Sequence, residues 1–264
     1  MRIALGLEYD GGRFHGFERQ VGPRTVQEEL ERAIGKVAAT ENVRVICAGR
    51  TDAGVHAAWQ VVHFDSDARR PLKAWVQGVN RYLADDAAVL WAQPVSDRFH
   101  ARFSATGRRY RYRILNRPIR PAIEAGRVAW EYRPLDARSM HRAAQSLVGE
   151  HDFTSFRAAG CQARQPVRRL YRIDVTRKGQ YITIDIHANA FLQQMVRIIA
   201  GTLIAVGANE RPLEWPASLL AARDRRLAGI TAPPAGLCLV GIDYPATFAL
   251  PVPTADERDD NPHW

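Results

Sequence analysis

Two successive runs of the same strand and helix order constrain the fold of this chain more than any other feature. In the first half, hydrophobic periodicity predicts strand, helix, strand, strand, helix and strand at residues 2–9, 25–38, 43–47, 59–64, 72–83 and 88–94. The second half gives nearly the same order at residues 108–115, 136–148, 169–176, 181–187, 190–206 and 237–244. Each run follows the β-α-β-β-α-β order of a ferredoxin-like unit. The sequence therefore predicts an α+β protein with two ferredoxin-like halves whose sheets adjoin and share a central cleft.

The boundary between these halves is predicted near residue 104. Residues 1–104 then form the N-terminal half and residues 105–250 the C-terminal half, while residues 251–264 form a mobile tail with three prolines and five charged residues. Two helix starts are predicted from local chemistry. Thr25 and Glu28 have the spacing of a capping box, and Asn189 is expected to cap the helix at residues 190–206.

Hydropathy and cysteine spacing indicate where the protein functions and which kinds of site it lacks. No apolar run reaches the length that spans a membrane, since the longest is interrupted by Gln193, Gln194 and Arg197. The three cysteines are scattered and lack the spacing of metal ligands. These features predict a protein of the reducing cytoplasm with no membrane segment, no disulfide framework and no zinc site.

Positive charge is concentrated in two stretches of the chain. The whole sequence carries a net charge of +9. Residues 98–133 contain ten arginines and two glutamates, and residues 157–178 contain six arginines, one lysine and one aspartate. Neutralisation of backbone phosphates supplies much of the affinity of proteins for nucleic acid. The clustering therefore predicts a polyphosphate partner.

One loop combines glycines with a carboxylate. Residues 48–56 place Asp52 between Gly49 and Gly54, directly after a predicted strand, with Arg50 two residues away. Glycines allow a tight turn and a close approach of backbone to ligand, and a neighbouring cation favours the ionised carboxylate. Two interpretations stay open from the residues alone: an aspartate that hydrogen-bonds its own turn, and a reactive carboxylate.

The loop and several later blocks resemble the TruA family of tRNA pseudouridine synthases. The resemblance covers residues 3–244 and is carried, in family order, by residues 48–56, 61–64, 99–106, 109–112, 152–156, 189–191 and 195–197. Two departures stand out. Phe17 and Glu18 occupy the place where the family commonly has Trp-Gln, and Gln194 occupies a place where a histidine often precedes the methionine.

The resemblance implies an isomerase that converts uridines 38, 39 and 40 in the anticodon stem and loop of tRNA to pseudouridine. Such an enzyme detaches the uracil from the ribose and rejoins it through C5, so neither a redox cofactor nor a metal is expected. The uridine must leave the base stack to reach the site. The resemblance also implies the pseudouridine synthase fold, which has a large antiparallel sheet flanked by helices and its active site in the central cleft. It implies a homodimer in which one tRNA contacts both subunits.

The resemblance assigns Asp52 as the nucleophile and Arg197 as its ion-pair partner. The residues agree, because Arg197 is the one charge in the apolar stretch 190–206 and a buried guanidinium needs a partner. Its alternative is a side chain that extends to the solvent. Leu237 matches an apolar residue of the family's uracil pocket, although it also reads as a core leucine. Arg50 is expected to replace the flipped base or to grip its phosphate.

Alternation along residues 108–115 separates aromatic from basic side chains. Tyr110 and Tyr112 lie on one face, and Arg109 and Arg111 on the other. Tyr110 matches the family's active-site tyrosine and is predicted to stack on the flipped base, and its phenol oxygen is a candidate base for the proton on C5. Tyr112 is predicted to pack in the core, and packing of both tyrosines is the alternative. Arg109 and Arg111, with Arg168 on another predicted strand, are expected to contact the tRNA backbone.

Two other functions compete with the isomerase. A non-catalytic RNA-binding or chaperone protein on the same scaffold would keep the arginine clusters but could lose Asp52, Tyr110 or Arg197, and all three are present. A metal-dependent nuclease would need clustered carboxylates, and Asp85-Asp86 stands without companions in the sequence. The sequence favours the isomerase.

Overall fold

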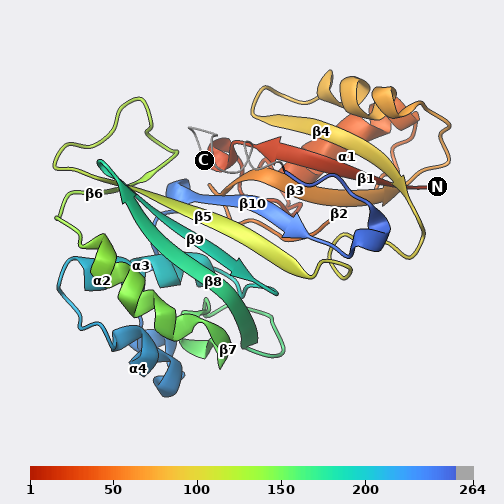
Figure 1. The fold of residues 1–264 in the computed structure, drawn as a ribbon. Helices are drawn as coiled ribbons and strands as arrows, with labels where there is room; N and C mark the ends of the chain where they lie inside the picture. The colour runs from red at the N-terminus through yellow and green to blue at the C-terminus, as the bar shows by residue number, and fades with distance from the viewer. Residues whose placement is uncertain (254–264) are drawn as a thin grey trace. The chain divides into compact units, whose positions relative to one another are not determined.

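The computed structural model describes residues 1–253, and the chain divides into two compact units. The first unit comprises Met1–Thr106 with Cys238 and the described residues after it, and the second comprises Gly107–Leu237. Each unit combines helices with a mostly antiparallel sheet (Figure 1), which confirms the α+β class. Residues 238–250 group with the first unit, although the sequence pattern placed them in the second half. Of the predicted tail, residues 254–264 lie outside the described residues.

The sheet of the first unit is built around the N-terminal strand. Strand β1 (Arg2–Tyr9) pairs antiparallel with β3 (His56–Asp65) on one side and with β4 (Ala87–Val95) on the other. The short strand β2 (Ile46–Cys47) pairs with β3, and β10 (Leu237–Asp243) runs parallel to β3 through its residues 238 and 239. β10, which comes late in the sequence, therefore lies in the same sheet as β1.

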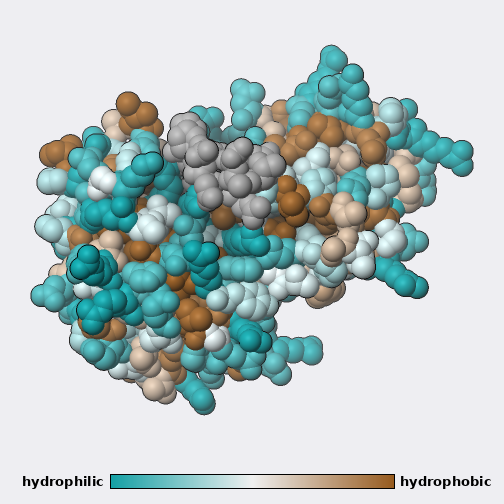
Figure 2. Space-filling model, in the orientation of Figure 1, coloured by the Kyte–Doolittle hydropathy of each residue, from teal (hydrophilic) through white to brown (hydrophobic). Residues whose placement is uncertain are grey.

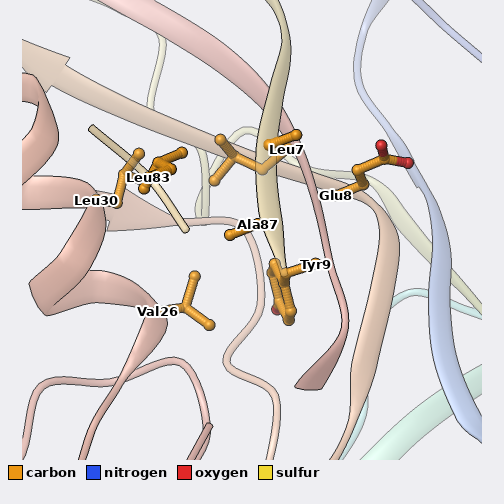
Figure 3. A pocket seen from close by; sticks show the side chains of 8 residues that line it. Leu7, Glu8, Tyr9, Val26, Leu30, Leu83 and Ala87 are labelled. Carbon is orange, nitrogen blue, oxygen red and sulfur yellow. The ribbon is translucent and has the colours of Figure 1, made fainter. Parts of the chain in front are cut away.

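One long helix and one short helical segment cover this sheet. Helix α1 (Val26–Ala38) buries Val26, Leu30 and Ile34, which lie on one face because they recur at helical spacing. Ala74–Gly78 has π-helical geometry and places the fully buried Trp75 against Phe64 of β3, with ring centroids 5.3 Å apart. Figure 3 shows a hollow between α1 and β1, with lining that is apolar apart from Glu8, which points away. None of the predicted site residues lines it.

The strands of the second unit pair mostly antiparallel. Its strands follow the order β5 (Gly107–Asn116), β9 (Tyr181–Ala188), β8 (Val167–Lys178) and β7 (Gly149–Asp152), and β6 (Ala129–Glu131) runs parallel to β5. Alternation explains the central strand, because Ile182, Ile184 and Ile186 are all buried. Helix α2 (Ala137–Ala144) packs against β8, and α3 (Met195–Gly207) packs against α2 and β5. Helix α4 (Trp215–Ala222) contacts both helices.

The first predicted helix cap is correct in position but makes no capping hydrogen bond, and the second was wrong. Thr25 occupies the N-cap position of α1 in an extended conformation, but its hydroxyl is buried and makes no hydrogen bond to the helix. Helix α3 begins at Met195 rather than at residue 190, and its N-cap is Gln194 in the left-handed conformation with a φ of 60°. Asn189 lies five residues earlier, where its side chain accepts hydrogen bonds from the amides of Arg169 and Ala190. It fixes a loop rather than a helix.

The surface of the second unit carries much of the positive charge. On β8 the exposed basic side chains are Arg169, Arg172, Arg177 and Lys178. Most side chains on the face drawn in Figure 2 are hydrophilic. Among residues 1–253, every helix lacks the length or the apolar character needed to cross a membrane.

Candidate functional site

The loop that carries Asp52 is fixed by hydrogen bonds at its base and at its tip. At the base, Ala48 donates its amide to the carbonyl of Val61 over 2.8 Å, and Gln60 Nε2 donates to the carbonyl of Gly49 over 2.7 Å. At the tip, the Val55 amide donates to the Asp52 carbonyl over 3.1 Å. Gly54 has a φ of +75° inside this turn, a conformation that glycine adopts without strain. Asp52 is thus the first residue of a tight turn and is half-buried.

A second segment supports the same loop from its other side. The Phe17 amide donates to the Thr51 carbonyl over 3.0 Å, and the Gly54 amide donates to the Phe14 carbonyl over 3.2 Å. The Tyr9 hydroxyl and the Thr51 hydroxyl share a buried hydrogen bond of 2.8 Å. The backbone around Asp52 is therefore held between β3 and residues 14–17, which gives its carboxylate a defined position.

Arg50 lies in the same loop as Asp52, and its guanidinium forms an ion pair with the Glu18 carboxylate. The two side chains are 57% and 48% exposed, so the pair lies at the surface. Sequence reasoning singled out Glu18 as a departure from the family pattern but missed this pairing. No spacing rule connects residues 18 and 50, because the folded loop brings them together.

Two buried histidines have structural roles. The amide of Gly11 donates to His56 Nδ1 over 3.0 Å, and the amide of Ala101 donates to His63 Nδ1 over 3.1 Å. Burial, together with the nearby Arg2 guanidinium, lowers the pKa of His63 to about 4. His63 is therefore neutral near pH 7 and accepts a hydrogen bond from the loop that follows β4.

The two tyrosines of β5 have different surroundings. Tyr112 is fully buried, and its hydroxyl donates to the Pro233 carbonyl over 2.8 Å. Burial raises the pKa of Tyr112, so it remains a neutral packing residue. Tyr110 is 8% exposed and contacts Phe191 edge to face, with ring centroids 5.1 Å apart. This contact fixes the plane of the Tyr110 ring.

Residues 232–237 bring Arg197 and Leu237 into one region of the second unit. Arg197 Nε donates to the Ala232 carbonyl over 2.8 Å, and the Ala232 amide donates back to the Arg197 carbonyl over 3.1 Å. This double contact anchors the guanidinium of a half-buried arginine in α3. Leu237 follows the turn Pro234–Gly236 and is 5% exposed at the first position of β10.

The three arginines predicted to contact the tRNA backbone differ in how they are held. Arg111 Nε donates to Asp185, its cross-strand neighbour on β9, over 2.7 Å. Arg168 donates to the carbonyls of Gln165 and Val167 through one nitrogen, while its buried Nε has no hydrogen-bond partner in the described part of the chain. Burial lowers the pKa of Arg168. Arg109 is half-buried on β5.

The structure thus gathers the predicted residues into two groups. Asp52 and Arg50 share one loop of the first unit, and Arg197, Leu237 and Tyr110 belong to the second. The predicted ion pair between Asp52 and Arg197 involves one residue from each unit and stays a prediction. Asp86, which a nuclease would need as a metal ligand, instead binds Arg24 through both of its oxygens at 2.6 and 2.8 Å.

The chemistry available at the loop is that of a positioned carboxylate. Asp52 is partly shielded from solvent, lies on a backbone that several hydrogen bonds hold, and has a cationic neighbour at position 50. Such a group can act as a nucleophile or can stabilise positive charge that develops on a sugar. A fixed aromatic ring at Tyr110 can offer its face to a flipped base.

The family model and the relatives found by sequence give one consistent result. A family model described as tRNA pseudouridine synthase matches residues 7–104 and 143–245. The tRNA pseudouridine synthase A of Pseudomonas aeruginosa is 56% identical over 264 residues, which cover 100% of this chain and 90% of that protein. The protein of the same name from Escherichia fergusonii is 57% identical over 252 residues, which cover 96% of this chain and 93% of that protein. Among solved structures, a chain from the crystal structure of a Cbf5-Nop10-Gar1 complex aligns over 76% of this chain and 45% of its own length, with a TM-score of 0.34 and 12% identity.

Proposed function

This chain belongs to the tRNA pseudouridine synthase family and isomerises uridine in tRNA, and from that premise we propose that its targets are uridines 38, 39 and 40 of the anticodon arm. The observation that carries the proposal is the fixed loop around Asp52. Hydrogen bonds from Phe17 and Gln60 hold its backbone, and its sequence has the family's pattern. A carboxylate in such a setting needs little rearrangement before it attacks.

In this mechanism Asp52 adds to the substrate as the bond between the ribose and the uracil breaks. Arg197 faces the aspartate as its ion-pair partner, and Nε of this arginine is already anchored to the Ala232 carbonyl. Tyr110 stacks on the flipped uracil while it turns, because its ring plane is fixed by Phe191. Leu237 lines the uracil pocket with an apolar side chain.

The tRNA backbone is contacted by arginines of the second unit in this proposal. Arg109 and Arg111 belong to β5, and Arg168 belongs to β8. The Nε of Arg168 is buried, so we expect this arginine to contact a phosphate through a terminal nitrogen. Arg111 must share its guanidinium with Asp185, so we expect a weaker contribution from it.

The active form is proposed to be a cytoplasmic homodimer in which one tRNA contacts both subunits. Closed two-fold symmetry is the commonest arrangement of soluble oligomers. It would present the basic stretches of two chains to a single polyanion, which suits the charge clusters at residues 98–133 and 157–178.

Position mapping tests the target assignment. Unmodified tRNA transcripts with a single uridine among positions 38, 39 and 40 are incubated with the protein, and pseudouridine is located at nucleotide resolution. We expect modification at each of these positions and none in a matched transcript with cytidine at all three. Pseudouridine only elsewhere in the tRNA would refute the assignment, and its complete absence would refute the isomerase function.

A further inference from the structure

We propose that Glu18 tunes substrate binding by competing with RNA phosphate for the guanidinium of Arg50. This inference rests on the proposed function, in which Arg50 takes the role that the sequence predicts for it and replaces the flipped base or grips its phosphate. The pair is formed by residues of the same unit, and Glu18 and Arg50 are both near half exposed. An exposed ion pair of this kind is weak enough for a phosphate to displace.

Hydrogen bonds fix the backbone on both sides of Glu18, which limits the positions that its carboxylate can reach. On one side, the Phe17 amide donates to the Thr51 carbonyl over 3.0 Å, which ties residue 17 to the loop that carries Arg50. Phe17 itself is 1% exposed. On the other side, the Arg19 amide donates to Gln27 Oε1 over 3.1 Å. Glu18 therefore sits between two anchored neighbours and beside the arginine.

Competition of this kind has an electrostatic signature. When a free arginine binds a phosphate, a counterion leaves the nucleic acid and binding weakens as salt rises. When Arg50 must first separate from Glu18, the freed carboxylate binds a cation from solution, which offsets the counterion that the phosphate releases. The native protein therefore gains less from Arg50 at low salt than a variant without the carboxylate would.

The substitution Glu18→Gln removes the charge but keeps the shape, and it restores the residue type that the family commonly carries at this place. We expect it to bind unmodified tRNA about threefold more tightly at low salt, the effect of losing one exposed charge interaction. The plot of log affinity against log salt should steepen by about 0.7 to 0.9, the value for one additional phosphate contact. KM should fall, and kcat should stay the same.

Glu28→Gln is the matched control. Glu28 pairs with Arg19 at 3.6 Å, and the exposed fractions of the two side chains, 43% and 61%, resemble those of Glu18 and Arg50. The control makes the same change in net charge, so it reports the effect of charge alone. The decisive comparison adds Glu18→Gln to an Arg50→Ala background, where the gain in affinity should vanish because the competing cation is gone.

Binding is measured by fluorescence anisotropy with the full chain and an unmodified tRNA transcript over a range of salt concentrations. The proposal is overturned by an unchanged salt slope in Glu18→Gln, by an equal gain in Glu28→Gln, or by a gain that persists without Arg50. Because the readout is binding, it is separate from the proposed activity. A native protein that forms no pseudouridine would refute the activity, while the salt slopes would still decide the role of Glu18.

Discussion

Gly16 gives a quantitative test of how strictly the position of the Asp52 loop is set. Its φ is +94°, and a Cβ atom at this position would lie 2.8 Å from the Thr51 carbonyl oxygen and 3.3 Å from the Asp52 carbonyl carbon. Gly22 has nearly the same backbone conformation, with a φ of +97°, but nothing lies within 4 Å of its Cβ position. The two glycines therefore separate backbone strain from displacement of the loop.

The substitution Gly22→Ala should cost about 1 kcal/mol of stability, because an alanine is strained at positive φ. Gly16→Ala carries the same strain plus a steric clash of about 1 to 3 kcal/mol, which gives a total of about 2 to 4 kcal/mol. The contacted atoms belong to the backbone of the Asp52 loop, so the clash can be relieved only by moving the loop. A shift of about 1 Å at a catalytic group can lower turnover by about 100-fold.

Two measurements check this expectation. Urea unfolding gives the stability of each variant, and single-turnover pseudouridine formation at saturating enzyme gives the catalytic rate. We expect Gly22→Ala to lose stability and keep the native rate, and Gly16→Ala to lose both. Equal rates in the two variants would refute the claim that this contact positions Asp52.

Two further predictions concern groups outside the loop. The folded pKa of His63, about 4, lies below its unfolded value of 6.5, so the stability it confers is present above pH 6.5 and is lost as pH falls toward 4. We expect this contribution to reach at most about 3 kcal/mol. In urea unfolding between pH 4 and 7, the free energy of unfolding of His63→Gln should depend less steeply on pH than that of the native chain. Parallel curves for the two proteins would contradict this. Tyr110→Phe keeps the ring contact with Phe191, so tRNA affinity should change less than about twofold, while loss of the phenol oxygen as a base for C5 should slow pseudouridine formation by about 100-fold. An unchanged rate would limit Tyr110 to stacking.

Much of the fold could be predicted because its main strands and one long helix have clear periodicity. The predicted strand at residues 2–9 has the same bounds as β1 (Arg2–Tyr9). In α1, the predicted apolar face of Val26, Leu30 and Ile34 is buried. Alternation likewise located β5 and β9 to within a residue or two.

The elements that escaped prediction lack such a signal. Strands β6 and β7 have three and four residues, too few to show alternation. Helix α4 has no pronounced apolar face, although Pro216 stands in its first turn, where proline is tolerated. The start of α3 was placed too early because the residues after Asn189 are apolar, and composition does not reveal that Gln194 turns into the left-handed region before the helix.

The candidate site shows the same division. The sequence indicated Asp52 because glycines and a cation surround it within one short segment. It could not indicate that Tyr9 and Gln60 bond to this loop, or that Glu18 pairs with Arg50, since these contacts depend on strands and segments brought together by folding. The parallel pairing of β10 with β3 likewise joins residues far apart in the chain.

The most direct test of the central claim replaces the carboxylate of Asp52 by an amide. The variant Asp52→Asn is incubated with tRNA that carries tritium at C5 of its uridines, and release of tritium to water is followed alongside tRNA affinity. We predict native release from the unaltered chain, none above background from the variant, and a similar affinity for tRNA in both. Release at the native rate by Asp52→Asn would show that this carboxylate is not the nucleophile.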